Sequence, residues 1–127
     1  MKVILTSLRD RNRVFVAFVP DEIEARALLK AIESAPHEWN ERDFVVLLIC
    51  PLEPTPTRAD IRFLSDCQEL RSHFGVRESE RAFVLVGKDG GEKARWNDMP
   101  PLEELWALVD AMPMRQQEMR EREKSRP

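Results

Sequence analysis

Two cysteines are the residues best suited to nucleophilic or redox chemistry. Cys50 ends an apolar run and Cys67 lies in a stretch with helical spacing. They form no Cys-x-x-Cys motif, and two cysteines are too few for a disulfide framework or a cysteine-based zinc site. We interpret Cys67 as a buried core residue. Cys50 precedes Pro51, and a partly exposed, reactive thiol is the alternative to a buried one there.

Acids and histidines offer weaker candidates for chemistry. Asp21 and Glu22 follow an apolar run and Pro20, where they could act as a general acid and base or could simply cap a helix. His37 and His73 are far apart in the sequence, so we expect no metal site.

A glycine turn, Lys88-Asp89-Gly90-Gly91, raises the question of phosphate binding. A phosphate loop joins a strand to a helix N-terminus, whereas apolar or alternating residues flank this turn on both sides. Asp-Gly between two strands favours a β-hairpin. An anion or nucleotide site that uses Lys88, Arg95 and Arg115 remains an alternative.

The segment Met112-Pro113-Met114-Arg115 combines adaptable methionines with an arginine. It could be a recognition surface, or a kinked helix end that packs its methionines on a sheet. The candidate binding residues are therefore Asp21, Glu22, Lys88, Asp89, Arg95, Met114 and Arg115.

The composition narrows the class of protein. The chain has 127 residues, 43% of them hydrophobic and 34% charged, with a net charge of −3. This favours one globular domain and gives no global field for nucleic acid. No apolar run reaches the ~20 residues of a membrane span, and no convincing signal peptide is found. We expect a cytoplasmic protein, or the mature form of a longer one, that binds a protein partner, without nucleic acid, membrane or cofactor.

The elements that must position these residues follow from periodicity. Apolar runs predict strands at 13–19, 43–50, 81–87 and 91–96. Amphipathic spacing predicts helices at 21–35, 58–74 and 101–112, with a proline-rich loop at 51–57. The order β-α-β-α-β-β-α predicts an α/β fold, a mixed central sheet with helices on both faces, in the thioredoxin-like arrangement. Residues 1–113 would form the domain, and 114–127 a charged tail that is a frayed helix or disordered.

Two stretches give the chain a family likeness. "FVLVGKDGGEKARW" and "LWALVDAMPMRQQEMR" resemble the DUDES family, and "RNRVFVAFVPDE" and "ERDFVVLLI" are similar to its first strand, helix and second strand. The likeness covers roughly residues 7–120. The family is a domain of unknown function found in many bacterial proteins and in animal extracellular-matrix proteins, including equarin and the sushi-repeat-containing proteins. It implies a thioredoxin-like fold related to peroxiredoxins, with no agreed reaction.

In a thioredoxin-like fold the reactive cysteine lies at the start of the first helix, where the helix N-terminus stabilises a thiolate. The corresponding residues here, Pro20 to Ile23, contain no cysteine. We therefore expect a redox-silent binding or interaction module. The alternative is a peroxiredoxin-like or thiol-dependent oxidoreductase that uses Cys50 as an off-position thiol.

Overall fold

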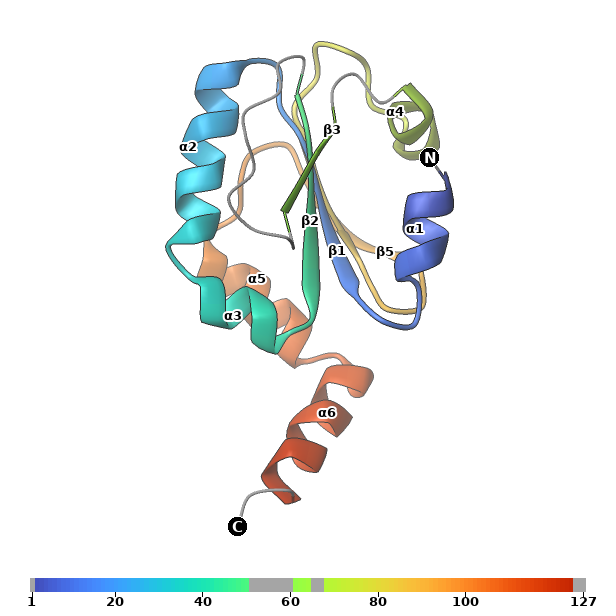
Figure 1. Cartoon of the computed structure of the whole chain (residues 1–127), viewed down its shortest axis with the longest axis vertical. Coiled ribbons are helices and arrows are strands. Elements are labelled where there is room, and N and C mark those ends of the chain that lie inside the picture. Colours follow the sequence, from blue (N-terminus) through green and yellow to red (C-terminus); the bar gives the residue numbers. More distant parts are fainter. Residues whose placement is uncertain (1, 51–60, 65–67, 125–127) are drawn as a thin grey trace.

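A five-stranded mixed sheet forms the centre of the computed structural model, which describes residues 2–50, 61–64 and 68–124. Its strands are β1 (Arg13–Phe18), β2 (Phe44–Ile49), β3 (Ile61–Leu64), β4 (Ala82–Val86) and β5 (Glu92–Trp96), in the spatial order β3-β2-β1-β4-β5. β1 pairs in parallel with β2, and β2 with β3, while β4 is antiparallel to both β1 and β5 (Figure 1).

Helices cover both faces of this sheet. α2 (Glu22–Glu33), α3 (Pro36–Glu41) and α5 (Leu102–Asp110) lie on one face, and α1 (Lys2–Leu8) and α4 (Gln68–Phe74) lie on the other (Figure 1). The expected α/β, thioredoxin-like architecture is confirmed.

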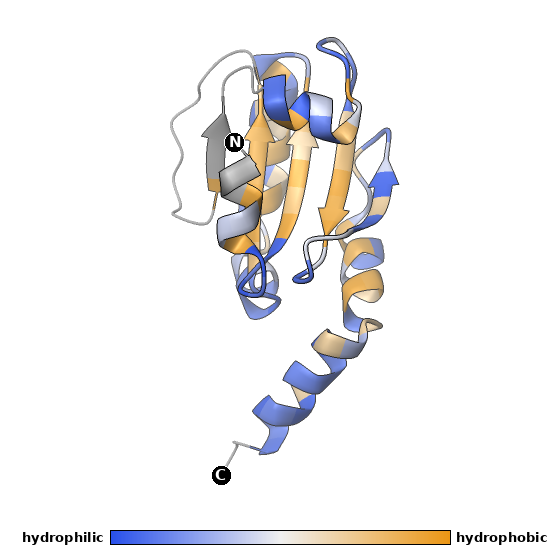
Figure 2. Cartoon of the chain, turned by 90° about the vertical axis from the view of Figure 1, so that its right-hand side faces the viewer, coloured by the Kyte–Doolittle hydropathy of each residue, from blue (hydrophilic) through white to orange (hydrophobic). Residues whose placement is uncertain are grey.

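The three inner strands separate two apolar cores. Every residue of β1, β2 and β4 is buried, as the continuous apolar runs predict for a sheet covered on both sides. Phe15 and Ala17 face the core under α2 and α5, whereas Val14, Val16 and Phe18 face the core under α1 and α4. Figure 2 shows these strands as the most hydrophobic part of the molecule.

The glycine turn is a hairpin corner. β4 and β5 pair on either side of it, and Gly90 has φ +85°, a conformation that glycine adopts without a Cβ clash. The backbone N–H of Gly87 donates to the carbonyl of Gly91 at 2.9 Å and closes the turn. The interpretation of this turn as a hairpin rather than a phosphate loop is confirmed.

Several local expectations were wrong. Within the helix expected over 58–74, the described residues form a strand at Ile61–Leu64 and a helix at Gln68–Phe74. The physical reason is that β2 has an open edge, which Ile61–Leu64 closes by parallel pairing.

Pro36 starts the short helix α3, a favourable place for proline, and α3 buries Trp39 completely. Cys67 and the loop expected at 51–57 lie outside the described residues.

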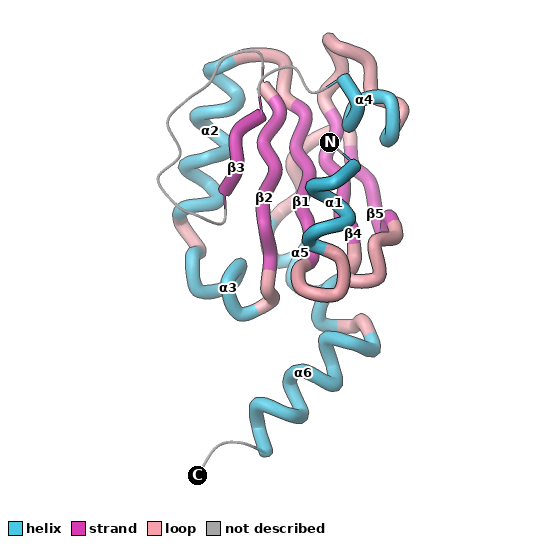
Figure 3. Tube along the Cα trace, turned by 45° about the vertical axis from the view of Figure 1, so that its right-hand side comes forward, coloured by secondary structure: helices cyan, strands magenta, loops and turns pink. Residues whose placement is uncertain are grey.

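A last helix, α6 (Pro113–Lys124), leaves the lower end of the sheet and projects away from it (Figures 1 and 3). It is charged along most of its length, and Arg115 is its one buried residue. The division of the chain at residue 113 stays a prediction. Among the described residues no helix is both long and apolar enough to cross a bilayer.

Candidate functional sites

The N-terminus of α2 lies at the upper end of the sheet, which we define as the end where β1 finishes at Phe18. Asp21 caps this helix, and its carboxylate accepts a hydrogen bond from the backbone N–H of Glu24 at 2.9 Å. Glu22 pairs with Arg26 one turn along the helix. These contacts support capping, because an N-cap carboxylate satisfies an N–H group that the helix leaves free. Acid–base chemistry by Asp21 and Glu22 stays a prediction.

Cys50 follows β2 at the same end, and it is buried. Only 1% of the residue is exposed, within the core that lies between the sheet and helices α2 and α5. Of the two alternatives left open for Cys50, a buried or a partly exposed thiol, the structure has the buried one. Reactive cysteines lie in accessible, electropositive surroundings, whereas this one is packed as a small hydrophobic residue.

A groove of about 350 Å³ opens between α2 and β4 at the upper end. Arg81, directly before β4, donates hydrogen bonds to Glu24 and to Asp98, the latter at 2.9 Å. The bonds to Glu24 contribute most to raising the pKa of Arg81 above its usual value. We call this feature the α2–β4 groove; its lining residues are Val19, Glu24, Ala27, Leu28, Ala31, Arg81, Phe83, Asp98 and Met99.

The lower end of the sheet, where β1 begins, carries buried charges. Arg13 is 1% exposed, and its guanidinium donates two hydrogen bonds to Glu118 of α6, each 3.1 Å long. Lys88 donates to Glu118 at 2.8 Å and to Asp43 at 2.9 Å. Burial alone would raise the pKa of Glu118, but the hydrogen bonds from Arg13 and Lys88 outweigh it and lower that pKa. We call these four residues the Glu118 cluster.

A second set of charges joins α3, α5 and α6 beside this cluster. Asp110 accepts hydrogen bonds from Arg42 at 2.8 and 3.0 Å and from the buried Arg115 at 2.9 Å. Burial opposes ionisation of Asp110, but these bonds lower its pKa below the usual value. Arg42 also lies over the Trp106 ring, 4.8 Å from its centroid. The base of α6 is thus held by partly buried ion pairs.

The hairpin turn and the start of α6 enclose a pocket of about 390 Å³ beside the Glu118 cluster. Met112, Pro113 and Met114 supply an apolar wall, and Lys88 and Lys93 come from the hairpin. We call it the turn pocket, and its lining residues are Arg13, Gly87, Lys88, Asp89, Lys93, Met112, Pro113 and Met114.

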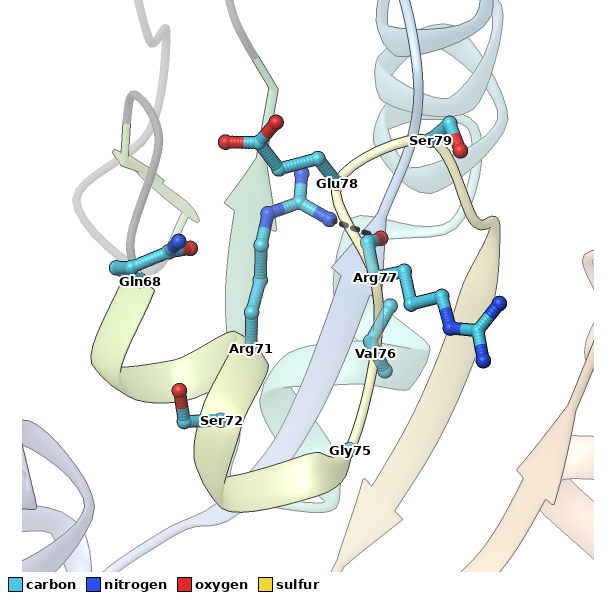
Figure 4. A pocket seen from close by; sticks show the side chains of 8 residues that line it. All are labelled: Gln68, Arg71, Ser72, Gly75, Val76, Arg77, Glu78 and Ser79. Atoms are coloured by element: carbon cyan, nitrogen blue, oxygen red, sulfur yellow. Dashed lines mark hydrogen bonds between the residues drawn. The ribbon is translucent and has the colours of Figure 1, made fainter.

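A hollow of about 660 Å³ lies beside α4, where Arg71 reaches toward the loop that leads to β4 (Figure 4). Arg71 is 4% exposed, donates to the carbonyl of Arg77 at 2.8 Å and lies over the ring of Phe18. Its contacts hold the loop against the sheet, so a structural role accounts for this arginine.

The structure brings some of the predicted site residues together and separates others. Lys88, Asp89 and Met114 line the turn pocket, and Arg115 lies next to it, 4.0 Å from Glu118. Asp21 and Glu22 lie at the opposite end. Arg95 pairs with Glu92 and donates to the carbonyl of Phe74, so it does not line a pocket with Lys88 and Arg115.

Sequence reasoning missed the partners of these residues. Arg13 carried a signal, because it is a charged residue directly before the apolar residues of a strand. No such signal marked the acids Glu118, Asp43 and Asp110, because the sequence around them contains many other acidic residues. Only the fold shows which acids meet the buried cations.

Solved structures similar to this one are peroxiredoxins and thioredoxins. The reduced 2-Cys peroxiredoxin of Plasmodium vivax matches with a TM-score of 0.69 and 20% identity, over 89% of this chain and 84% of the other. The AhpC protein of Mycobacterium tuberculosis matches with a TM-score of 0.63 and 16% identity, over 84% and 76%. An exposed lipoprotein thioredoxin of Streptococcus pneumoniae gives 0.59 and 16%, over 85% and 90%. At these identities the likeness establishes the fold alone.

No curated protein matches the chain. A family model does match, over residues 4–118, and its description is a domain of unknown function, DUF4174. The expectation of a thioredoxin-like domain of unknown function is thereby confirmed, and the chain belongs to the DUF4174 family.

Proposed function

We propose that this protein is a redox-silent thioredoxin-like domain that binds a protein partner. The observation that supports this most strongly is at the start of α2, where Asp21 occupies the N-cap position that a reactive cysteine would need. The thiol of Cys50 lies in the core instead. A peroxiredoxin-like reaction at Cys50 would require this buried thiol to reach a peroxide.

The α2–β4 groove is the proposed contact surface. Ile23 is 81% exposed and lies one helical turn before Ala27, which lines the groove. Glu24 and Asp98 set two carboxylates against the single guanidinium of Arg81 at its edge. An apolar groove with an excess of negative charge suits a partner segment that presents an apolar side chain beside a lysine or arginine.

The finer family likeness supports a binding role. If the chain shares the DUDES relationship indicated by its GKDGG and AMPMR segments, its relatives include matrix proteins, in which interaction modules are common. A net charge of −3 suits a protein partner better than nucleic acid.

Thiol chemistry tests the redox-silent part. The native protein is treated with a slow alkylating probe between pH 5 and 9, and each modified cysteine is assigned by mass spectrometry. We expect slow modification of Cys50, and the same peroxide consumption by Cys50→Ala as by the unsubstituted protein. Rapid modification of Cys50, with peroxide consumption lost in Cys50→Ala, would establish the thiol-dependent alternative.

Peptide selection tests the binding part. A peptide library displayed on phage is selected on the immobilised protein, and we expect recovered peptides to pair an apolar residue with a basic one. Ile23→Ser should abolish their binding, whereas Leu108→Ser, which replaces another exposed apolar residue on α5, should preserve it. Recovery of no sequence family, or equal binding by Ile23→Ser, would contradict the proposed surface.

A further inference from the structure

The turn pocket joins two segments that are distant in the sequence. The hairpin contributes Gly87, Lys88 and Lys93, and the junction between α5 and α6 contributes the methionines. Its volume of about 390 Å³ is within the ~300–1,000 Å³ of typical small-molecule sites. The protein's ion pairs hold both walls in place, because Glu118 of α6 binds Lys88 of the hairpin.

Two cations that line this pocket, the buried Arg13 and the partly buried Lys88, have a hydrogen-bond donor left over. Arg13 uses both terminal nitrogens on Glu118 and the carbonyl of Arg42, but its Nε is buried and has no partner among the described residues. The ammonium of Lys88 has three N–H donors, and the described residues occupy two of them, through Asp43 and Glu118. A buried donor is normally satisfied, so the unused Arg13 Nε beside this pocket calls for an acceptor, and Lys88 can offer its third N–H to the same group.

A third cation, Lys93, lies in an exposed ion pair at the pocket. The Lys93 side chain is 36% exposed and pairs with the exposed Asp89 at 2.6 Å. A Cβ added at Gly87 would lie 2.6 Å from Cε of Lys93, so the lysine folds across the glycine. An exposed ion pair of this kind is weak, so Lys93 can release Asp89 and bind an incoming anion.

The opposite wall of the pocket is apolar. Met114 is among the exposed large hydrophobic residues, and methionine adapts its shape to different ligands. Asp43 and Glu118 already balance the charges of Arg13 and Lys88, so the pocket suits a monoanion better than a phosphate dianion. We propose that the turn pocket binds a small organic carboxylate with an apolar body, its head on Arg13, Lys88 and Lys93 and its body on Met112 and Met114.

Titration by nuclear magnetic resonance tests this site. Backbone amide shifts of residues 87–91 are followed with phenylacetate, hexanoate and 4-methylpentanoate, and separately with phenylacetamide and inorganic phosphate. We expect saturable shifts with at least one carboxylate, and none with the amide or with phosphate. Absence of saturation with all three carboxylates, or equal binding of phenylacetamide or phosphate, would overturn the proposal.

Substitutions at the mouth distinguish the pocket from a general charge effect. Lys93→Gln should weaken carboxylate binding about tenfold through loss of a charge-assisted hydrogen bond. Gly87→Ala should also weaken it, because the added methyl group displaces Lys93 while the charge is kept. Lys30→Gln, an equal charge change on the exposed face of α2, should leave binding unchanged. Equal affinity in all three variants would place the carboxylate elsewhere.

This inference is independent of the proposed partner surface. Ile23→Ser alters the upper end of the sheet, so it should leave carboxylate binding intact while abolishing peptide binding. Lys93→Gln should weaken carboxylate binding and leave peptide binding intact. Each proposal can therefore fail without the other.

Discussion

The two ends of the sheet carry similar groups in different surroundings. At the upper end, Arg81 bridges Glu24 and Asp98 with much of its side chain in solvent. At the lower end, Arg13 makes a bidentate pair with Glu118 while 1% exposed. The same guanidinium–carboxylate chemistry thus occurs once on the surface and once in the interior.

Burial decides what each ion pair can do. Exposed pairs contribute little to stability and exchange their partners easily, which suits a surface that recognises another molecule. Buried pairs are costly to break, because removal of one partner leaves an uncompensated charge. The exposed pairs suit the recognition surface that we propose at the upper end, whereas the pairs at the lower end hold α6 beside the turn pocket.

Loss of Arg13 should have the largest effect on stability. Arg13→Met removes the bidentate partner of Glu118 and should lower the free energy of unfolding by about 1.5–3 kcal/mol, because the partly exposed Glu118 keeps its bond from Lys88. Denaturant unfolding followed by tryptophan fluorescence measures this change. Glu118→Gln combined with Arg13→Met should cost less than the sum of the two single changes, since the charges interact directly. Additive costs would show that the pair is not coupled.

Low pH should have the next largest effect on stability, through the carboxylates at the lower end of the sheet. The pKa values of Glu118 and Asp110 are lowered in the folded protein from usual values of 4.5 and 3.8. Their stabilising contribution is thus complete above pH 4.5 and is lost as the pH falls through the lowered folded values. The denaturant midpoint, measured from pH 7 to pH 3, should decline below pH 4.5.

Glu118→Gln provides the control for this pH dependence. It removes one of the two titrating carboxylates, so the decline below pH 4.5 should become shallower. If the denaturant midpoint declines with pH as steeply as before, other carboxylates cause the acid sensitivity, and the ion pairs at the base of α6 do not.

Much of the fold could be predicted from the sequence, because the inner strands are encoded locally. The apolar runs at 13–19, 43–50 and 81–87 predicted three strands, which the structure confirms at Arg13–Phe18, Phe44–Ile49 and Ala82–Val86, and Asp89-Gly90 predicted the hairpin. Ile61–Leu64 was misassigned to a helix because its spacing suits a helix as well as a strand. Its state is decided by the open edge of β2, which is a non-local cause.

The candidate sites were less predictable for a related reason. The turn and the methionine segment were each recognised, but nothing in the sequence indicated that they meet. Their contact depends on α5 returning the chain to the lower end and on Arg13 and Lys88 binding Glu118. The position of Cys50 beside Pro51 left both a buried and a partly exposed thiol open, and the packing of α2 and α5 on one face of the sheet decided for burial.

The smallest effect on stability should come from Arg81→Gln. Its ion pairs with Glu24 and Asp98 are exposed, so the denaturant midpoint should not change measurably. The substitution removes the one guanidinium that offsets two carboxylates at the edge of the α2–β4 groove. Affinity for a selected peptide with a basic residue should therefore increase, most clearly at low salt, where electrostatic attraction is least screened. Isothermal titration calorimetry at two salt concentrations measures this affinity.

Arg81→Gln and Arg13→Met together test whether burial explains the contrast between the two ends. Each removes a guanidinium that binds a carboxylate through two nitrogens, so the chemistry lost is nearly the same. A large loss of stability from Arg81→Gln would mean that the upper ion pairs are structural, and the groove would then be a poor recognition surface. An unchanged midpoint with altered peptide affinity would show that the charges at the upper end affect binding and not stability. Solvent screens these exposed pairs, so they contribute little to folding.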